Sequence, residues 1–153
     1  MDRPHKPRVF VDADVLFAGA ASPSENSASL VVLRMAEITL IDALTCQQVI
    51  IEAERNLSAK IPQALSAFRL LVDRSLRILP DPTPERLAPY TGIANPKDLP
   101  ILVCAILGNC PFLVSFNLRD YEPGHPDVTV LKPGEYVLRV RDLLANLDID
   151  DSE

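Results

Sequence analysis

The chain has 153 residues, 48% of them hydrophobic, and a formal net charge of −6. This size and apolar content suit one domain with a continuous core, which we expect over residues 1–147 ahead of an acidic, disordered tail at 148–153. The negative charge excludes a protein that holds nucleic acid by broad phosphate neutralisation, because that mode needs clustered Lys and Arg.

Cysteine usage and hydropathy bear on the location of the protein. The chain has three cysteines at irregular spacing, which fits a reducing compartment better than a disulfide framework. The start MDRPHKPRVF lacks an apolar leader segment, and no later apolar run reaches about 18 residues without a charge or a break. We therefore expect a cytoplasmic protein with no membrane partner.

Short apolar strands alternate with helical segments along the chain. The expected strands are Arg8–Val11, Ile38–Ile41, Leu76–Leu79, Phe112–Phe116 and Val128–Leu131. The helices begin after Asp12, at Ala28, at a Thr45–Gln48 capping box, at Ile61, at Pro96 behind an Asn95 cap, and at Pro133, where the last helix runs to Leu147. This alternation predicts an α/β fold with three α/β/α layers and a roughly five-stranded parallel sheet.

Polar side chains follow the strands at the edge where such sheets bind ligands, beyond the carboxyl ends of the strands. Asp12 follows the first strand, and Asn117 and Asp120 follow the fourth. Asp98 stands in the first turn of a central helix, where peptide dipoles favour an ionised carboxylate. Taken singly, Asp12 and Asp98 also fit helix capping, and Asn117 fits an ordinary turn.

Glu52 is a further candidate, on the helix that begins near Thr45. Val49, Ala53 and Leu57 are spaced to face the core, which puts Glu52 at the edge of the buried stripe. Glu54 points about 200° away, so at most one of the two glutamates serves a site, and we expect Glu52. A solvated glutamate is the structural alternative.

Several carboxylates at one sheet edge repel each other unless cations or protons compensate their charge. Hard oxygen ligands suit Mg²⁺ or Mn²⁺. The pattern therefore predicts a divalent metal site.

Four segments carry a family resemblance. They are VFVDADVLFAG at Val9–Gly19, EAERNL at Glu52–Leu57, KDLPILVCAI at Lys97–Ile106 and LVSFNLRDY at Leu113–Tyr121. In order and spacing they resemble the signature segments of PIN domains, including VapC-like toxins, over a stretch from Arg8 to about Leu144. The resemblance implies a metal-dependent endoribonuclease that prefers single-stranded RNA, forms a homodimer and has an antitoxin protein as partner.

The resemblance also assigns roles to single residues. Asp12, Glu52 and Asp98 match the first three acidic positions: Asp12 and Asp98 would ligate the metal, and Glu52 would ligate it or orient the attacking water. Asn117 falls where many members have the fourth acid, and Asp120 matches a second acid often seen there.

Two departures from the family pattern lie beside Asp12. Ala13 replaces the usual small hydroxyl residue, and Asp14 replaces a frequent asparagine. A third departure is Asn117, which brings no charge. Its neutral side chain would weaken the binding of a second metal ion unless Asp120 turns inward. Asp14 would partly restore the lost negative charge.

Four more residues are candidates for contacts around the site. Ser115 could bond a ligand carboxylate or a phosphate oxygen, and Arg34, Lys97 and Arg119 could guide the nucleic-acid backbone. The alternative for each of the three cations is a solvated surface.

Two competing functions remain. Asp12-Ala13-Asp14 also resembles the nucleophile motif of haloacid-dehalogenase-like phosphatases, although Val15-Leu16 stands where that family has Gly-Thr. A PIN scaffold with weakened catalysis could instead act as an RNA-binding or protein-interaction module, because fold alone does not establish activity. A toxin role and a role in RNA maturation are not separated by these residues.

Overall fold

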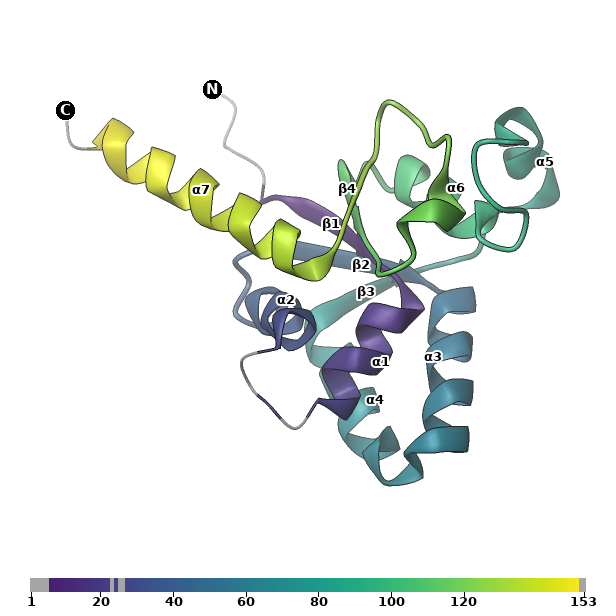
Figure 1. The fold of residues 1–153 in the computed structure, drawn as a ribbon, viewed down its shortest axis with the longest axis horizontal. Helices are drawn as coiled ribbons and strands as arrows, with labels where there is room; N and C mark the ends of the chain where they lie inside the picture. The colour runs from purple at the N-terminus through teal and green to yellow at the C-terminus, as the bar shows by residue number, and fades with distance from the viewer. Residues whose placement is uncertain (1–5, 23, 25–26, 152–153) are drawn as a thin grey trace.

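The fold is a three-layer α/β/α arrangement around one sheet (Figure 1). The computed structural model describes residues 6–22, 24 and 27–151, with side chains up to residue 147. The strands are β1 (Arg8–Val11), β2 (Asp42–Cys46), β3 (Leu76–Leu79), β4 (Phe112–Val114) and β5 (Thr129–Leu131). They run parallel in the order β3-β2-β1-β4-β5, which confirms the expected sheet.

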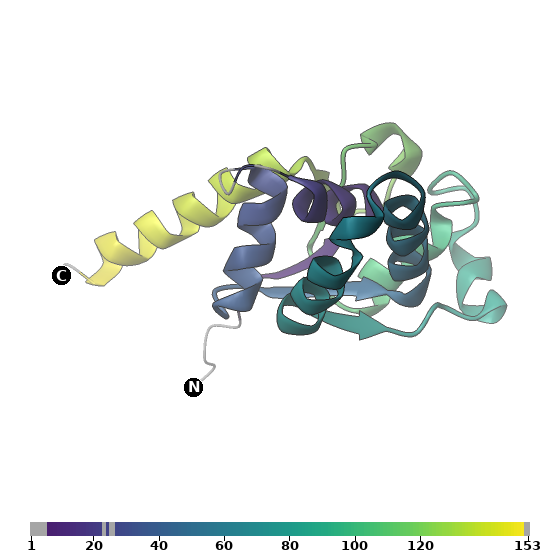
Figure 2. The ribbon, with the colours of Figure 1, turned by 90° about the horizontal axis from the view of Figure 1, so that it is seen from below.

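Helices cover both faces of this sheet. On one face, four helices pack together: α1 (Ala13–Ala21), α2 (Ala28–Glu37), α3 (Gln47–Lys60) and α4 (Leu65–Ser75). On the other face, α6 (Leu99–Leu107) packs on β2 and β4, with the short α5 (Pro84–Leu87) beside it. The last helix, α7 (Pro133–Asp151), contacts α2 and then extends away from the body (Figure 2).

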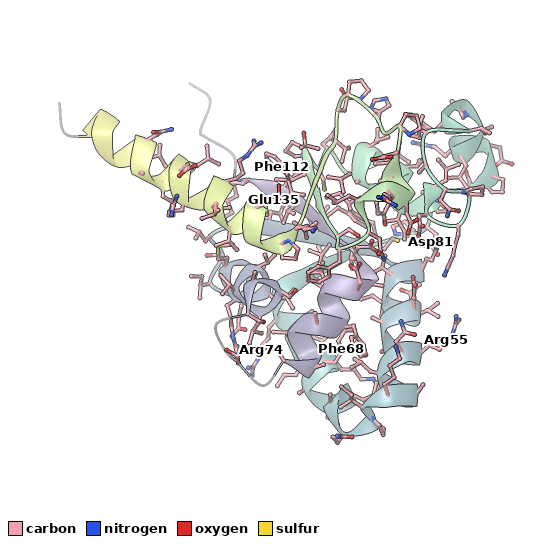
Figure 3. The ribbon with its side chains drawn as sticks, viewed as in Figure 1. Arg55, Phe68, Arg74, Asp81, Phe112 and Glu135 are labelled. Carbon is pink, nitrogen blue, oxygen red and sulfur yellow. The ribbon has the colours of Figure 1, made fainter. Side chains whose placement is uncertain are left out.

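The core lies on both sides of the central strand β1. Val9, Phe10 and Val11 have no exposed surface, because neighbouring strands and two layers of helices surround them. Phe68 of α4, labelled in Figure 3, is 1% exposed and belongs to the same core. Because β1 is packed from both sides, the core fixes the end of this strand, where Asp12 lies.

No helix among the described residues is both long and apolar enough to span a bilayer.

The second strand is β2 (Asp42–Cys46), and our prediction of Ile38–Ile41 was wrong. The N–H groups of Ile38, Thr39 and Leu40 donate to carbonyls of α2, so three of the four N–H groups in this segment are used at the end of that helix. Thr39 has φ 66°, a left-handed turn conformation that a β-branched residue rarely adopts. Hydrogen bonding at the helix end overrode the β propensity of ITLI.

Two expected helix starts were also wrong. Thr45 belongs to β2, and its Oγ1 donates to Val11 O at 2.9 Å, so it cannot cap α3. Asn95 does not open a helix at Pro96; its Oδ1 accepts from the Lys97 N–H in a turn, and α6 begins at Leu99 with Asp98 as its N-cap.

Smaller differences concern the lengths of elements. The helix expected from Ile61 is divided into the 3₁₀ turn Pro62–Ala64 and α4. The fourth strand stops at Val114, two residues early, and the last helix continues to Asp151, four residues beyond Leu147. The expected acidic tail therefore lies partly in α7, and residues 152–153 lie outside the described part of the chain.

Candidate active site

Asp12 lies at the carboxyl end of β1 and is the N-cap of α1. Its Oδ1 accepts a hydrogen bond of 2.7 Å from the Ala13 N–H, so the capping alternative describes part of its role. Its Oδ2 accepts two more bonds of 2.7 Å, from the hydroxyls of Ser115 and Tyr121. Asp12 is 7% exposed, and these donors offset the cost of burying its charge. Its carboxylate is held in one orientation.

Asp14 joins α1 to the chain that leaves β4. Its Oδ2 accepts from the Phe116 N–H at 3.0 Å and from the Asn117 side-chain amide at 3.2 Å. The Ser115 hydroxyl lies 3.4 Å from the same oxygen. The other oxygen, Oδ1, is buried and has no hydrogen-bond partner among the described residues. Oδ2 of this carboxylate is therefore held in place by hydrogen bonds, and Oδ1 is left without a donor.

Glu52 and Asp98 reach the same region from α3 and α6. Lys97 Nζ lies 3.9 Å from Glu52 Oε1. Asp98 is the N-cap of α6, but its side chain makes no capping hydrogen bond, so its carboxylate is not occupied by the helix. Glu54 forms an ion pair with Arg69 at 3.4 Å instead. Of the two glutamates, Glu52 is the one that the fold directs to this region.

One cavity of about 260 Å³ collects these side chains, and we call it the acidic cavity. It is lined by Asp12, Ala13, Asp14, Glu52, Asn95, Lys97, Asp98, Asn117 and Asp120. The fold thus brings together all five residues that we expected to be catalytic, from the ends of β1 and β4, from α3 and from the turn before α6. Five carboxylates face a single lysine in this cavity.

The acidic cavity carries more negative charge than its surroundings compensate. Burial raises the pKa of Asp98 to about 6, with further repulsion from Asp12, Asp120 and Glu52, while Lys97 acts in the opposite direction. Burial likewise raises the pKa of Asp14 to about 6, and the charge of Asp12 adds to this shift. A bound cation would relieve this repulsion.

The donor chemistry of the cavity fits a hard divalent cation. Its ligand atoms are carboxylate oxygens, one of which, on Asp14, is buried without a partner. Among the described residues, no three His, Cys, Asp or Glu side chains converge on one point as the ligands of a single ion do. An ion would therefore have to draw several of these carboxylates inward.

Two buried hydroxyls, those of Ser115 and Tyr121, donate hydrogen bonds to Asp12. Ser115 has no exposed surface, and its hydroxyl donates to Asp12, a carboxylate of the site. Tyr121 was not among our predicted residues. It is 2% exposed, and burial, followed by the nearby charge of Asp12, raises the pKa of its hydroxyl, which remains a donor. Its place in the segment LRDY was the only signal in the sequence.

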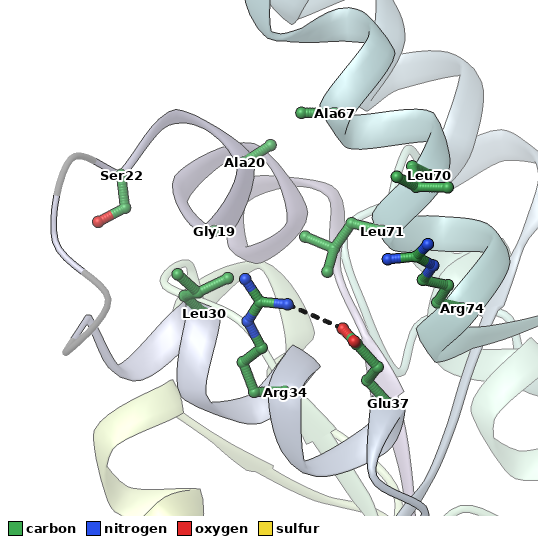
Figure 4. Close-up of a pocket in the computed structure, with 10 residues that line it drawn as sticks. All are labelled: Gly19, Ala20, Ser22, Leu30, Arg34, Glu37, Ala67, Leu70, Leu71 and Arg74. Atoms are coloured by element: carbon green, nitrogen blue, oxygen red, sulfur yellow. Dashed lines mark hydrogen bonds and ion pairs between the residues drawn. The ribbon is translucent and has the colours of Figure 1, made fainter.

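Two of the three predicted cations lie elsewhere. Arg34 lines a separate pocket between α1, α2 and α4, where its Nη1 pairs with Glu37 Oε2 at 2.9 Å (Figure 4). Arg119 is exposed in the 3₁₀ helix Leu118–Tyr121 and does not line the acidic cavity. Only Lys97 lines it, together with Asn95, which we had interpreted as a helix cap.

These features define an α/β protein with an acidic cavity at the carboxyl ends of parallel strands, which is where such sheets bind ligands. Residues 8–119 match the PIN domain family, and the chain belongs to that family. This match favours the PIN interpretation over the phosphatase alternative.

A comparison with solved structures agrees with this fold. The chain is similar to a chain in the crystal structure of VapBC2 from Rickettsia felis bound to a DNA fragment from their promoter. The two share 17% sequence identity with a TM-score of 0.61, over 82% of this chain and 98% of that chain. No curated protein sequence matches.

Proposed function

We propose that this protein is an endoribonuclease that uses Mg²⁺ or Mn²⁺ to hydrolyse phosphodiester bonds in single-stranded RNA. The observation that carries the proposal is the acidic cavity, where carboxylates from several separate segments meet at the carboxyl ends of the strands. The PIN domain match supports a nuclease, because this family is generally one of hydrolases acting on nucleic acid.

The metal would act through the residues of the acidic cavity. When bound, a divalent ion lowers the pKa of a water molecule and neutralises charge on the phosphoryl oxygens. Asp12 and Asp98 would hold it, and Glu52 would hold it or orient the attacking water. Asp120 would add an oxygen ligand. Attack by water on phosphorus would leave a 5′-phosphate and a 3′-hydroxyl.

The remaining residues of the site would position these groups. The hydroxyls of Ser115 and Tyr121 hold Asp12 Oδ2, so the carboxylate need not reorganise when it binds a cation. Lys97 lies beside Glu52 and would attract a phosphate to the mouth of the cavity. Arg119 would act further out, whereas the position of Arg34 in another pocket gives it no part in this site.

The biological setting that we propose is a toxin–antitoxin pair. The VapBC2 structure from Rickettsia felis, similar in fold, supports an antitoxin protein as partner. We also propose a homodimer, to be measured by light scattering on the purified chain. Helix α4 is apolar at helical spacing, but it buries Phe68 and Val72 in the core of the same chain, so this spacing does not by itself indicate a dimer contact. A gene for a small antitoxin directly upstream would support the toxin role over RNA maturation.

Cleavage of a labelled single-stranded RNA tests the nuclease proposal. The purified chain is incubated with Mn²⁺, with Mg²⁺ or with EDTA, beside an Asp12→Asn, Asp98→Asn double variant. We expect cutting that needs the metal and that the variant loses. Folded protein that cuts none of several RNAs with either metal would contradict the proposal and favour the non-catalytic module.

A further inference from the structure

A second cavity lies directly beside the acidic cavity. It has a volume of about 390 Å³ and shares Glu52 and Lys97 with the acidic cavity, so the two form neighbouring compartments. We call it the side cavity, and it is lined by Gln48, Ile51, Glu52, Arg55, Asn56, Asp81 and Lys97. Any chain that fills the acidic cavity and continues past Lys97 would enter this space.

The spacing of residues on α3 explains the wall of the side cavity. Residues 48, 51, 52, 55 and 56 recur at intervals of three and four, which places them on one face of the helix. The opposite face carries the buried residues Val49, Ala53 and Leu57. The core thus fixes one side of α3, and the other side is presented to the side cavity.

Hydrogen bonds tie the three segments of the side cavity together. The Gln48 N–H, at the start of α3, donates to Asp81 Oδ1 at 2.9 Å, so Asp81 caps that helix from the loop after β3. The Gln48 side-chain amide donates to Lys97 O at 3.1 Å. The side cavity is therefore a fixed feature of the fold, and one oxygen of its aspartate is already engaged.

Two cations in the side cavity are available to an anion. Arg55 extends from the outer side of α3 (Figure 3) and makes no ion pair within the described part of the chain. The Lys97 side chain is 75% exposed and its 3.9 Å contact with Glu52 is long, so this pair is weak and can yield to a phosphate. Ile51, an apolar side chain that is 48% exposed, lines the same cavity.

This combination of groups matches a nucleotide. A guanidinium group binds phosphate oxygens with two parallel hydrogen bonds, and a base packs on an exposed apolar side chain. The amides of Gln48 and Asn56 can meet the edges of a base with donors and acceptors. On the basis of the proposed function, we propose that the side cavity binds the nucleotide adjoining the phosphodiester held in the acidic cavity, with Arg55 on its phosphate and Ile51 against its base.

RNA binding by an inactive chain tests the contact of Arg55. In the Asp12→Asn, Asp98→Asn background, Arg55→Ala should weaken binding of a labelled single-stranded RNA on the order of tenfold and reduce the salt dependence by about one phosphate contact. Arg74→Ala is the matched control, because Arg74 is an exposed arginine in another pocket. Alanine suits an exposed helix position, so both variants should fold.

The position of the contact is tested with RNAs that each carry one uncharged methylphosphonate linkage. One linkage should weaken binding to the Arg55-containing chain and have no further effect on Arg55→Ala, since both changes remove the same contact. Ile51→Ala and an abasic sugar at the neighbouring nucleotide should show the same non-additivity. In the active chain, Arg55→Ala should raise KM and leave kcat unchanged.

Two results would overturn the inference and leave the proposed function intact. In one, the RNA is bound and cut, yet Arg55→Ala behaves like Arg74→Ala. In the other, the losses of affinity caused by Arg55→Ala and by a methylphosphonate multiply at every linkage, so no single linkage is the one that Arg55 contacts. A parent chain that binds no RNA would instead overturn the proposed function, and this inference with it.

Discussion

The side-chain amide of Asn117 donates a hydrogen bond of 3.2 Å to Asp14 Oδ2, linking the end of β4 to the first turn of α1. The pair brings one carboxylate and one amide to the acidic cavity. An amide facing a carboxylate is satisfied in either order, whereas two facing carboxylates repel each other. Exchanging the two residues should therefore relieve the repulsion between two carboxylates, but only in part, because the Phe116 N–H donates to the same Asp14 oxygen and still needs an acceptor.

An exchange of the two residues tests this pair. Asn117→Asp alone should lower the free energy of unfolding, and adding Asp14→Asn should recover part of the loss, with a coupling of roughly 0.5–3 kcal/mol. The measurement is urea unfolding of the metal-free chain. Mn²⁺ affinity, measured by calorimetry, should fall in Asp14→Asn and return in the exchanged variant. A double variant no more stable than Asn117→Asp would show that the two side chains are not coupled.

Tyr121 and Tyr136 are both buried, but of the two only Tyr121 donates a hydrogen bond to Asp12, so Tyr136 serves as its matched control. Tyr121→Phe removes a donor from a buried carboxylate and should cost about 1.5–3 kcal/mol of unfolding free energy. Tyr136→Phe removes a buried hydroxyl that has no hydrogen-bond partner among the described residues, so it should be neutral or stabilising. Urea unfolding at neutral pH compares them. Equal costs for the two variants would contradict the role given to Tyr121.

The stability of the metal-free chain should fall as the pH rises from about 4 to about 6. The pKa of Asp14 and of Asp98 is about 6 in the folded chain, against an ordinary value of 3.8, so the folded state binds more protons in this range. The stabilising contribution is complete below pH 3.8 and lost above pH 6. Thermal unfolding across this range measures it.

Variants and metal separate this effect from other titrations. Asp98→Asn should reduce the pH dependence to the contribution of Asp14, whereas Asp73→Asn, an exposed change on α4, should leave it as it is. Saturating Mn²⁺ should reverse the slope, because metal binding needs ionised carboxylates. At about a hundredfold excess over Kd, the metal should add roughly 2.7 kcal/mol of stability. An unchanged slope in Asp98→Asn would remove Asp98 as its source.

Glu52 and Glu54 allow a matched test of catalysis. Glu52→Gln keeps the shape of the side chain but removes a charge from the acidic cavity, and it should lower RNA cleavage by roughly 10²-fold or more. Glu54→Gln breaks only a partly exposed ion pair with Arg69 and should leave the rate unchanged. Similar losses in the two variants would assign the effect to α3 as a whole and not to the Glu52 carboxylate.

Much of the site could be predicted because its positions are encoded locally. Asp12 follows a run of buried strand residues, and Glu52 falls at a helical interval from core residues, so sequence spacing alone directs both to the sheet edge. The order of the strands and helices, and hence the three layers, follows from the same alternation of apolar segments.

Propensity was misleading where hydrogen bonds decided the outcome, at the end of a helix in one case and between two strands in the other. The N–H groups of Ile38, Thr39 and Leu40 donate to carbonyls of α2, so the run at Ile38–Ile41 forms the turn after that helix. Thr45 has the sequence of a helix cap, but a neighbouring strand supplied its acceptor, Val11 O. Propensity weighs a few tenths of a kcal/mol to about 1 kcal/mol per residue, and satisfying buried polar groups weighs more.

The sequence by itself determined which carboxylates reach the edge of the sheet, because strand ends and helix faces are set by residues close together along the chain. Only the tertiary structure decided what surrounds them. The Tyr121 hydroxyl on Asp12 and the Asn117 amide on Asp14 join residues far apart in sequence, and the packing of α1, α2 and α4 places Arg34 in another pocket. Such contacts depend on how the layers pack, which no short segment specifies.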